Sequence, residues 1–167
     1  MSNPPQKSSA STLAIPEELG ERLVLGEISP AEFLGLSQEM LYEIATRGHD
    51  LLKTGMLQDA LDIFKGLVAA SPYDSVFHCN LAATYAHLER FGEAKDEYTR
   101  ALELNIGNVD ALVGRSEMYL REGNMPEALK DIQTALKLDP EAKRENTKRA
   151  RATLTILQKA GEATPKK

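Results

Sequence analysis

A 34-residue period constrains the fold of this chain more than any other feature. Three alanines stand 34 residues apart, and each lies in a similar short segment, LQDALDIFKGLV, FGEAKDEYTRAL and MPEALKDIQTAL, at positions Ala60, Ala94 and Ala128. A bulky residue follows each alanine four places later, at Phe64, Tyr98 and Ile132. Because residues four apart share one face of a helix, each segment is predicted to be helical. The period indicates stacked copies of one helical unit.

Each unit is predicted to contain two helices. Upstream of each alanine a second helical segment ends near Thr54, Leu88 and Glu122, and Gly55 and Gly123 supply two of the tight turns. The first segments also have small residues 34 positions apart, Gly48, Ala82 and Ser116. Small residues allow two helices to approach closely. One pair of helices cannot bury its apolar face, whereas stacked pairs form a continuous core.

Over residues 41–140 this pattern resembles the tetratricopeptide repeat. The chain has that family's 34-residue helix–turn–helix period, its small residues at the eighth and twentieth places, and its proline at the thirty-second place in two repeats, Pro72 and Pro140. The resemblance implies an all-α fold. Three tetratricopeptide repeats, 41–74, 75–108 and 109–140, would form a right-handed superhelix.

The flanking segments are predicted to cover the ends of the stack. Residues 16–38 form an N-terminal helical extension, in which Ser29 can cap a helix that begins at Pro30 and Glu32 can bond back to the cap. A capping helix is expected over 141–160, started by Asp139-Pro140. The polar residues 1–14 and 161–167 are expected to be disordered tails.

The charge is unevenly distributed along the chain. The net charge of −5 divides into −4 for residues 1–40, −6 for 41–140 and +5 for 141–167. The single cysteine cannot form an intramolecular disulfide, and no apolar run has the length of a signal peptide or a membrane span. We therefore expect a cytoplasmic protein with no membrane insertion.

No catalytic motif is found. The sequence lacks the phosphate-binding, nucleophile-elbow and HExxH patterns. His49, His78 and His87 have no cysteine or histidine companions at zinc-ligand spacing, and Cys79 has no identifiable base. His78 is expected to be a packing residue. We expect no enzymatic activity, no cofactor and no metal site.

In tetratricopeptide-repeat proteins the first helix of each repeat lines a concave wall, and the resemblance assigns the corresponding positions here. They are mostly small and apolar, which suits an extended peptide. The predicted peptide-binding groove consists of Tyr42, Ala45, His49, Leu52, Val76, Cys79, Asn80, Ala83, His87, Val113, Glu117, Leu120 and Arg121.

The same positions argue against one known type of groove. Family members that grip the acidic C-termini of heat-shock chaperones use two lysines, two asparagines and an arginine as a carboxylate clamp. Only one of those five residues is matched here, by Asn80, because the positions hold Ala45, His49, Asn80, Asp110 and Gly114. We therefore expect that this clamp is absent.

A narrower resemblance, over residues 28–138, is to the class II translocator chaperones of bacterial type III secretion. It is carried by Leu41-Tyr42-x-x-Ala45, by the Gly55-x-x-x-x-Ala60 spacing, and by Tyr73-Asp74-Ser75 with Phe77. The resemblance implies that the groove holds an extended apolar segment of a membrane-inserting client until export. It also implies a homodimer through the N-terminal helices, with contacts expected at Leu19, Leu23, Phe33 and Leu36.

Two other functions are weighed against this one. A general scaffold for a cytoplasmic signalling or motility complex needs the same kind of concave wall. Nucleic-acid binding would rest on the run KRENTKRAR at 143–151, which has five basic residues and no aromatic residue for base stacking. We expect this run to be a solvated helix face and nucleic acid not to be the partner.

Overall fold

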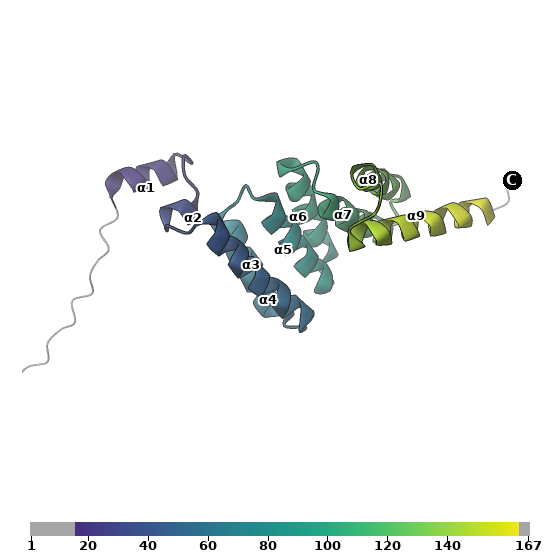
Figure 1. Cartoon of the computed structure of the whole chain (residues 1–167), viewed down its shortest axis with the longest axis horizontal. Coiled ribbons are helices and arrows are strands. Elements are labelled where there is room, and N and C mark those ends of the chain that lie inside the picture. Colours follow the sequence, from purple (N-terminus) through teal and green to yellow (C-terminus); the bar gives the residue numbers. More distant parts are fainter. Residues whose placement is uncertain (1–15, 164–167) are drawn as a thin grey trace, which may run out of the picture.

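The computed structural model describes residues 16–163, and all regular structure within that range is helical (Figure 1). The all-α prediction is confirmed. The predicted N-terminal tail, 1–14, and residues 164–167 of the predicted C-terminal tail lie outside the described range. The helices in order are α1 (Glu17–Val24), α2 (Pro30–Phe33), α3 (Gln38–Lys53), α4 (Leu57–Ala70), α5 (Ser75–His87), α6 (Phe91–Leu104), α7 (Val109–Arg121), α8 (Met125–Leu138) and α9 (Glu145–Ala163).

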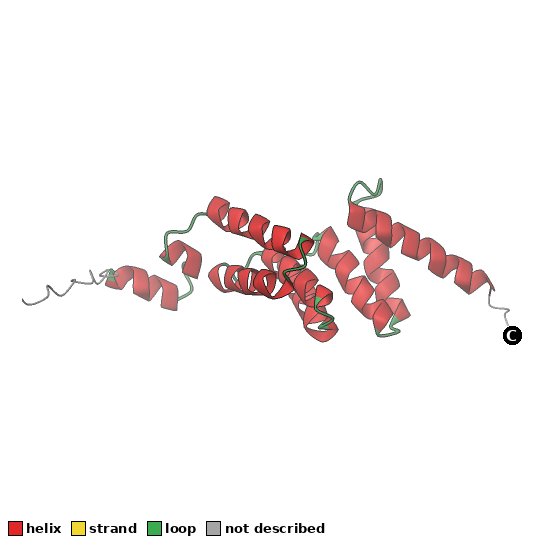
Figure 2. Cartoon of the chain, turned by 90° about the horizontal axis from the view of Figure 1, so that it is seen from below, coloured by secondary structure: helices red, strands yellow, loops and turns green. Residues whose placement is uncertain are grey.

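The middle of the molecule is a row of antiparallel helix pairs. Helix α3 packs on α4, α5 on α6, and α7 on α8, while α4 contacts α5 and α6 contacts α7 to join successive pairs. Both views show an elongated molecule with α1 and α2 at one end and α9 at the other (Figures 1 and 2). This is the stack of repeats that the period predicts.

Large and small side chains meet inside each pair, as the repeat pattern requires. A Cβ on Gly48 of α3 would lie only 2.7 Å from Cζ of Phe64 on α4, so the ring occupies the space that a side chain would need. The three repeat alanines and the bulky residues Phe64 and Ile132 are fully buried, each with 0% exposure. The helix axes can therefore approach to the distance that close packing demands.

The second and third repeats begin at the predicted residues, and the first begins earlier. Helices α5 and α7 start at Ser75 and Val109, while α3 starts at Gln38, before the predicted Leu41. Ser37 causes the earlier start, because its hydroxyl accepts the N–H of Met40 at 3.2 Å and caps the helix.

At the N-terminal end the predicted cap is confirmed. The Ser29 hydroxyl accepts the N–H of Glu32, and the Glu32 carboxylate accepts the N–H of Ser29 at 2.7 Å. Helix α2 packs on α4 and buries Ala31, whereas α1 packs on α2 and has no buried residue. Helix α1 is therefore the less firmly attached of the two.

At the C-terminal end the last helix begins later than predicted. The carboxylate of Asp139 accepts the N–H groups of Lys143 and Arg144 and the hydroxyl of Thr147, the last at 2.6 Å. These bonds fold residues 139–144 into a turn, with Ala142 in the left-handed region at φ 49°. Helix α9 then packs on α7 and α8 and buries Ala150. It continues to Ala163, so residues 161–163 of the predicted tail are helical.

Candidate functional site

Two adjoining cavities lie beside α5 and α7, with volumes of about 610 Å³ and about 370 Å³. They share four lining residues, Ala83, Tyr98, Asp110 and Asn146, so we treat them as one site and call it the groove. Helix α5 contributes small side chains, α7 contributes charged ones, and α6 contributes the ring of Tyr98. The N-terminal part of α9 also reaches the groove, through Asn146 and Arg149.

Small residues keep the groove open. Gly114 lies in the middle of α7, and a Cβ there would be 2.2 Å from Cζ of Tyr98. The tyrosine ring therefore lies against the backbone of α7 and reaches both cavities. Ala83 on α5 adds only a methyl group to each cavity. Larger side chains at these two positions would fill the space.

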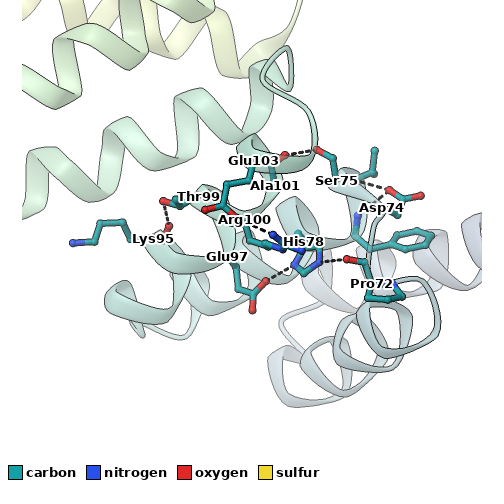
Figure 3. Close-up of polar contacts among 12 residues, drawn as sticks. Pro72, Asp74, Ser75, His78, Lys95, Glu97, Thr99, Arg100, Ala101 and Glu103 are labelled. Atoms are coloured by element: carbon teal, nitrogen blue, oxygen red, sulfur yellow. Dashed lines mark hydrogen bonds and ion pairs between the residues drawn. The ribbon is translucent and has the colours of Figure 1, made fainter. Parts of the chain in front are cut away.

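Polar contacts position α5 against the neighbouring helices. The hydroxyl of Ser75 donates to the carbonyl of Ala101 at 2.9 Å, and the amide of Asn108 donates to the Ser75 hydroxyl at 2.7 Å. His78 lies between the carboxylate of Glu97 on α6 and the carbonyl of Pro72 before α5 (Figure 3). The packing role predicted for His78 is therefore also a hydrogen-bonding role. These bonds join α5 to α6 and α7, and so fix the relative positions of three helices that line the groove.

One buried polar group in the groove has no partner. The amide nitrogen of Asn80 is buried and makes no hydrogen bond with any residue in the described range. Asn80 lines the smaller cavity, next to Cys79 and Val76. A buried donor without a partner costs about 1–3 kcal/mol, so rotation of this side chain toward an acceptor that enters the cavity would remove that cost.

Two titratable groups of the groove, the Cys79 thiol and the Tyr98 phenol, are buried and held neutral. Burial raises the pKa of the Cys79 thiol to about 12, and the charge of Asp110 adds to the effect. Burial likewise raises the pKa of Tyr98. The pKa of His49 is lowered by burial and by the charge of Lys53. A thiol with such a raised pKa is a poor nucleophile, so these groups present a neutral surface.

Two carboxylates and three arginines line the groove, and each except Arg121 forms an ion pair within the described part of the chain. Asp110 of α7 accepts from Arg144 at 3.0 Å and from the amide of Asn146 at 2.9 Å. Glu117 lies 3.3 Å from Arg149 of α9. Arg121, at the end of α7, lies over the ring of Phe91, with Cζ 4.3 Å from the ring centroid.

Most of the predicted groove residues are brought together here. The cavities are lined by His49, Val76, Cys79, Asn80, Ala83, His87, Glu117, Leu120 and Arg121. Ala86 of α5 and Asp110 and Gly114 of α7 line them as well. Only His49 comes from the first repeat, so the groove is formed mainly by the second and third repeats and α9.

Four predicted residues lie elsewhere. Ala45 and Val113 are in the core, 3% and 1% exposed, and Leu52 packs against that core. Tyr42 lies outside the groove, where its hydroxyl donates to Asp74 at 3.2 Å and its ring packs 5.3 Å from that of Phe77. Ala45, Cys79 and Val113 all occupy the fifth place of a repeat, and all three are buried because that place faces the neighbouring helices.

Several lining residues do not follow from the repeat positions of the first helices. Phe91 and Tyr98 come from α6, Asn105, Gly107 and Asn108 from the turn before α7, and Met118 from α7 itself. Arg144, Asn146 and Arg149 come from the C-terminal segment. The alternating small and aromatic residues of the repeat pattern indicate Tyr98, whereas nothing in the repeat pattern indicates the three C-terminal residues.

The basic run at 143–151 makes contacts within the chain. Besides the pairs of Arg144 and Arg149, Lys143 pairs with Glu141 and Lys148 with Glu145, and Arg151 donates to the carbonyl of Pro140. Each of the five basic residues on which a nucleic-acid interface would depend therefore forms a contact within the chain. The run is part of α9 and of the turn that precedes it.

The expected dimer contacts are only half exposed. Leu19, Leu23, Phe33 and Leu36 are each partly covered by α1, α2 or the core. The most exposed apolar residues of this region are their neighbours Val24, Leu25 and Leu34, at 86%, 65% and 66%. The most exposed apolar side chains of this region thus lie at the C-terminal ends of α1 and α2, next to the predicted residues.

No helix within residues 16–163 combines the length and apolar character needed to cross a bilayer. The same range has no group of three or more histidine, cysteine, aspartate or glutamate residues placed to hold a metal ion.

A family of known proteins with similar sequences contains the same helical repeat. A tetratricopeptide-repeat family model matches residues 79–143. Human serine/threonine-protein phosphatase 5 is 25% identical over 120 residues, which cover 72% of this chain and 24% of the phosphatase. The chain thus spans about a quarter of the length of that relative.

Solved structures show the same fold. The translocator chaperone SycD of Yersinia enterocolitica superposes with a TM-score of 0.70 at 23% identity, covering 77% of this chain and 98% of SycD. A type III secretion complex from Aeromonas hydrophila superposes with a TM-score of 0.73 at 21% identity, covering 89% and 100%. SycD has also been solved with a peptide of the translocator YopD, a complex that superposes at 0.65 with 23% identity and covers 75% and 97%.

Proposed function

We propose that this tetratricopeptide-repeat chain binds an extended segment of a partner protein in the groove and catalyses no reaction. The observation that carries the proposal is the unpartnered amide of Asn80 beside the neutral residues Cys79, Val76 and Ala83. An extended peptide has main-chain carbonyls without intramolecular partners, and its side chains alternate in direction. One such carbonyl would accept from Asn80 while apolar side chains enter the two cavities.

We further propose that the chain works in the cytoplasm as a holding chaperone of the type III secretion translocator class. The fold shared with SycD supports this, as does the peptide of YopD in one SycD structure. A membrane-inserting client exposes apolar segments that aggregate in water. A chaperone that binds one of them stabilises the soluble form by mass action.

The groove is tested by placing a charge in its centre. Ala83→Glu puts a carboxylate between the two cavities, where its desolvation opposes an apolar segment. The tagged chain is expressed in its own cell, and the co-purifying proteins are identified by mass spectrometry. We expect a secreted protein with segments apolar enough to enter a membrane, recovered with the unchanged chain and lost with Ala83→Glu.

Ala69→Glu is the matched control, since Ala69 is exposed on α4 and lines neither cavity. It should recover the same partner as the unchanged chain. Equal recovery with Ala83→Glu would refute the groove as the binding site. Val113 is unsuitable for such a test because it is 1% exposed, and a charge there would unfold the third repeat.

A second candidate function is a scaffold module that assembles a cytoplasmic complex. The match to phosphatase 5 favours it, because the matched region is 24% of a much larger protein. The same purification separates the two functions. A client with membrane-inserting segments supports the chaperone, whereas several soluble proteins of one complex support the scaffold.

We also propose that the chain forms a homodimer through α1 and α2. The exposed apolar side chains of Val24, Leu25 and Leu34 support this proposal. Helix α1 has no buried residue of its own, so pairing with a second copy would supply the apolar contacts that it lacks.

A further inference from the structure

Arg121 lines the groove, where an aromatic ring holds its guanidinium in place and no carboxylate of the described residues pairs with it. It is the last residue of α7, and its guanidinium lies over the ring of Phe91 at 4.3 Å from the centroid. No carboxylate of the described range forms an ion pair with it. Stacking on an aromatic face holds a guanidinium in place and leaves its N–H edge free to donate.

The other charges of the groove already neutralise one another. Asp110 is paired with Arg144, and Glu117 with Arg149. The lining thus has three arginines against two carboxylates, in a chain whose net charge is −5. The surplus positive charge belongs to Arg121.

Helix α9 and the turn before it determine the sign of the net charge of the groove lining. They supply Arg144 and Arg149, two of the three arginines, while both carboxylates belong to α7. Without the C-terminal segment the groove would hold one arginine and two carboxylates. The segment therefore both covers the end of the stack and makes the groove able to accept an anion.

We infer that the partner segment carries an aspartate or glutamate beside its apolar residues, and that Arg121 binds this carboxylate at the α7–α9 end of the groove. The inference rests on the proposed function. Planar N–H donors match a carboxylate, and such a charge-assisted bond is stronger than a neutral one. The contact differs from the carboxylate clamp of heat-shock-chaperone binders, whose five positions do not include Arg121.

The probe is a random dodecapeptide library selected on the full-length protein. We expect peptides that combine apolar residues with an aspartate or glutamate, and we expect their binding to be lost with Ala83→Glu. A selected peptide is then titrated beside its Glu→Gln or Asp→Asn form against the unchanged chain and Arg121→Gln. Each single change should weaken binding about tenfold, and the two together by no more than either alone.

Arg47→Gln is the control, because Arg47 is exposed on α3 and lines neither cavity. It should leave the affinity unchanged. Peptides that depend on Ala83 but show no acidic preference, or that ignore Arg121→Gln, overturn the inference and leave the proposed function standing. A selection that yields no peptide sensitive to Ala83→Glu overturns the proposed function itself.

Discussion

The imidazole of His78 lies 2.6 Å from a carboxylate oxygen of Glu97, and its other ring nitrogen lies 3.0 Å from the carbonyl oxygen of Pro72. Both partners are acceptors, so the ring satisfies them both only when it carries two protons. The hydrogen bond to Glu97 accordingly raises the pKa of His78, against the opposing effect of burial. This one ring joins α5 to α6 and to the turn that precedes α5.

The contribution of His78 to stability should depend on pH. Because its pKa is higher in the folded chain than the ordinary value of about 6.5, the contribution is complete below that value and is lost as pH rises through the folded pKa. Urea unfolding at closely spaced pH values should show this fall above about pH 6.5. Glu97→Gln should flatten it, whereas substitution of the exposed His87 should not. An identical fall in Glu97→Gln would contradict the assignment.

The close approach of Gly114 to Tyr98 should make this glycine intolerant of a side chain. Gly114→Ala must displace the Tyr98 ring or the helix, and we expect a loss of about 1–3 kcal/mol in the free energy of unfolding. Gly66→Ala is the control. Gly66 is exposed in α4 with no atom within 4 Å of the added methyl, so it should gain about 0.5–1 kcal/mol. Denaturant unfolding that shows equal effects at the two positions would refute the tight contact.

The ion pair between Arg115 and Asp131 should be the most important one for stability. Its two bonds measure 2.7 and 2.9 Å, and the Asp131 side chain is only 4% exposed. Asp131→Ala leaves the Arg115 charge half-buried without its partner, which should cost about 3 kcal/mol. Glu103→Ala breaks the exposed pair with Arg100 and should cost less than about 1 kcal/mol. Thermal unfolding of both variants checks the difference, and similar costs would contradict it.

The apolar surface on α1 and α2 should mediate self-association. Val24→Asp, Leu25→Asp and Leu34→Asp together place charges on it without touching the core, and light scattering should then report a monomer in place of a dimer. Ile106→Asp alters an equally exposed residue, 82% accessible, in the turn between α6 and α7, and should leave the mass unchanged. A dimer that survives the triple substitution would exclude this surface. Deletion of residues 1–38 is a poorer test, because it also removes the buried Ala31.

The repeat pattern is sufficient to predict the fold, because both helices of each repeat contain a residue that specifies how the two helices pack. A small residue on the first helix and a bulky residue on the second must meet, as Gly48 and Phe64 do, and only one register of the helices allows this. The resemblance to the tetratricopeptide repeat assigns Ala83 and Asn80 to a concave wall, and both line the groove. It does not separate Ala45 and Val113 from that wall, because burial at the fifth place depends on the next helix along the stack.

The C-terminal part of the groove could not be predicted in this way. The basic character of residues 143–151 is visible in the sequence, but the direction in which the segment leaves the third repeat depends on Asp139, whose carboxylate folds the intervening turn. That turn brings Arg144 to Asp110 and Arg149 to Glu117. A period of 34 residues contains no information about a segment that lies beyond the last repeat.

The position of α9 has a consequence for how such a chain can evolve. A premature stop codon just after the third repeat would do more than shorten the protein, because the recognition surface would change from attracting anions to repelling them. Insertions in the 139–144 turn would have the same outcome without removing a single helix. Ligand preference in this molecule is therefore encoded partly outside the repeats, in the turn that positions α9.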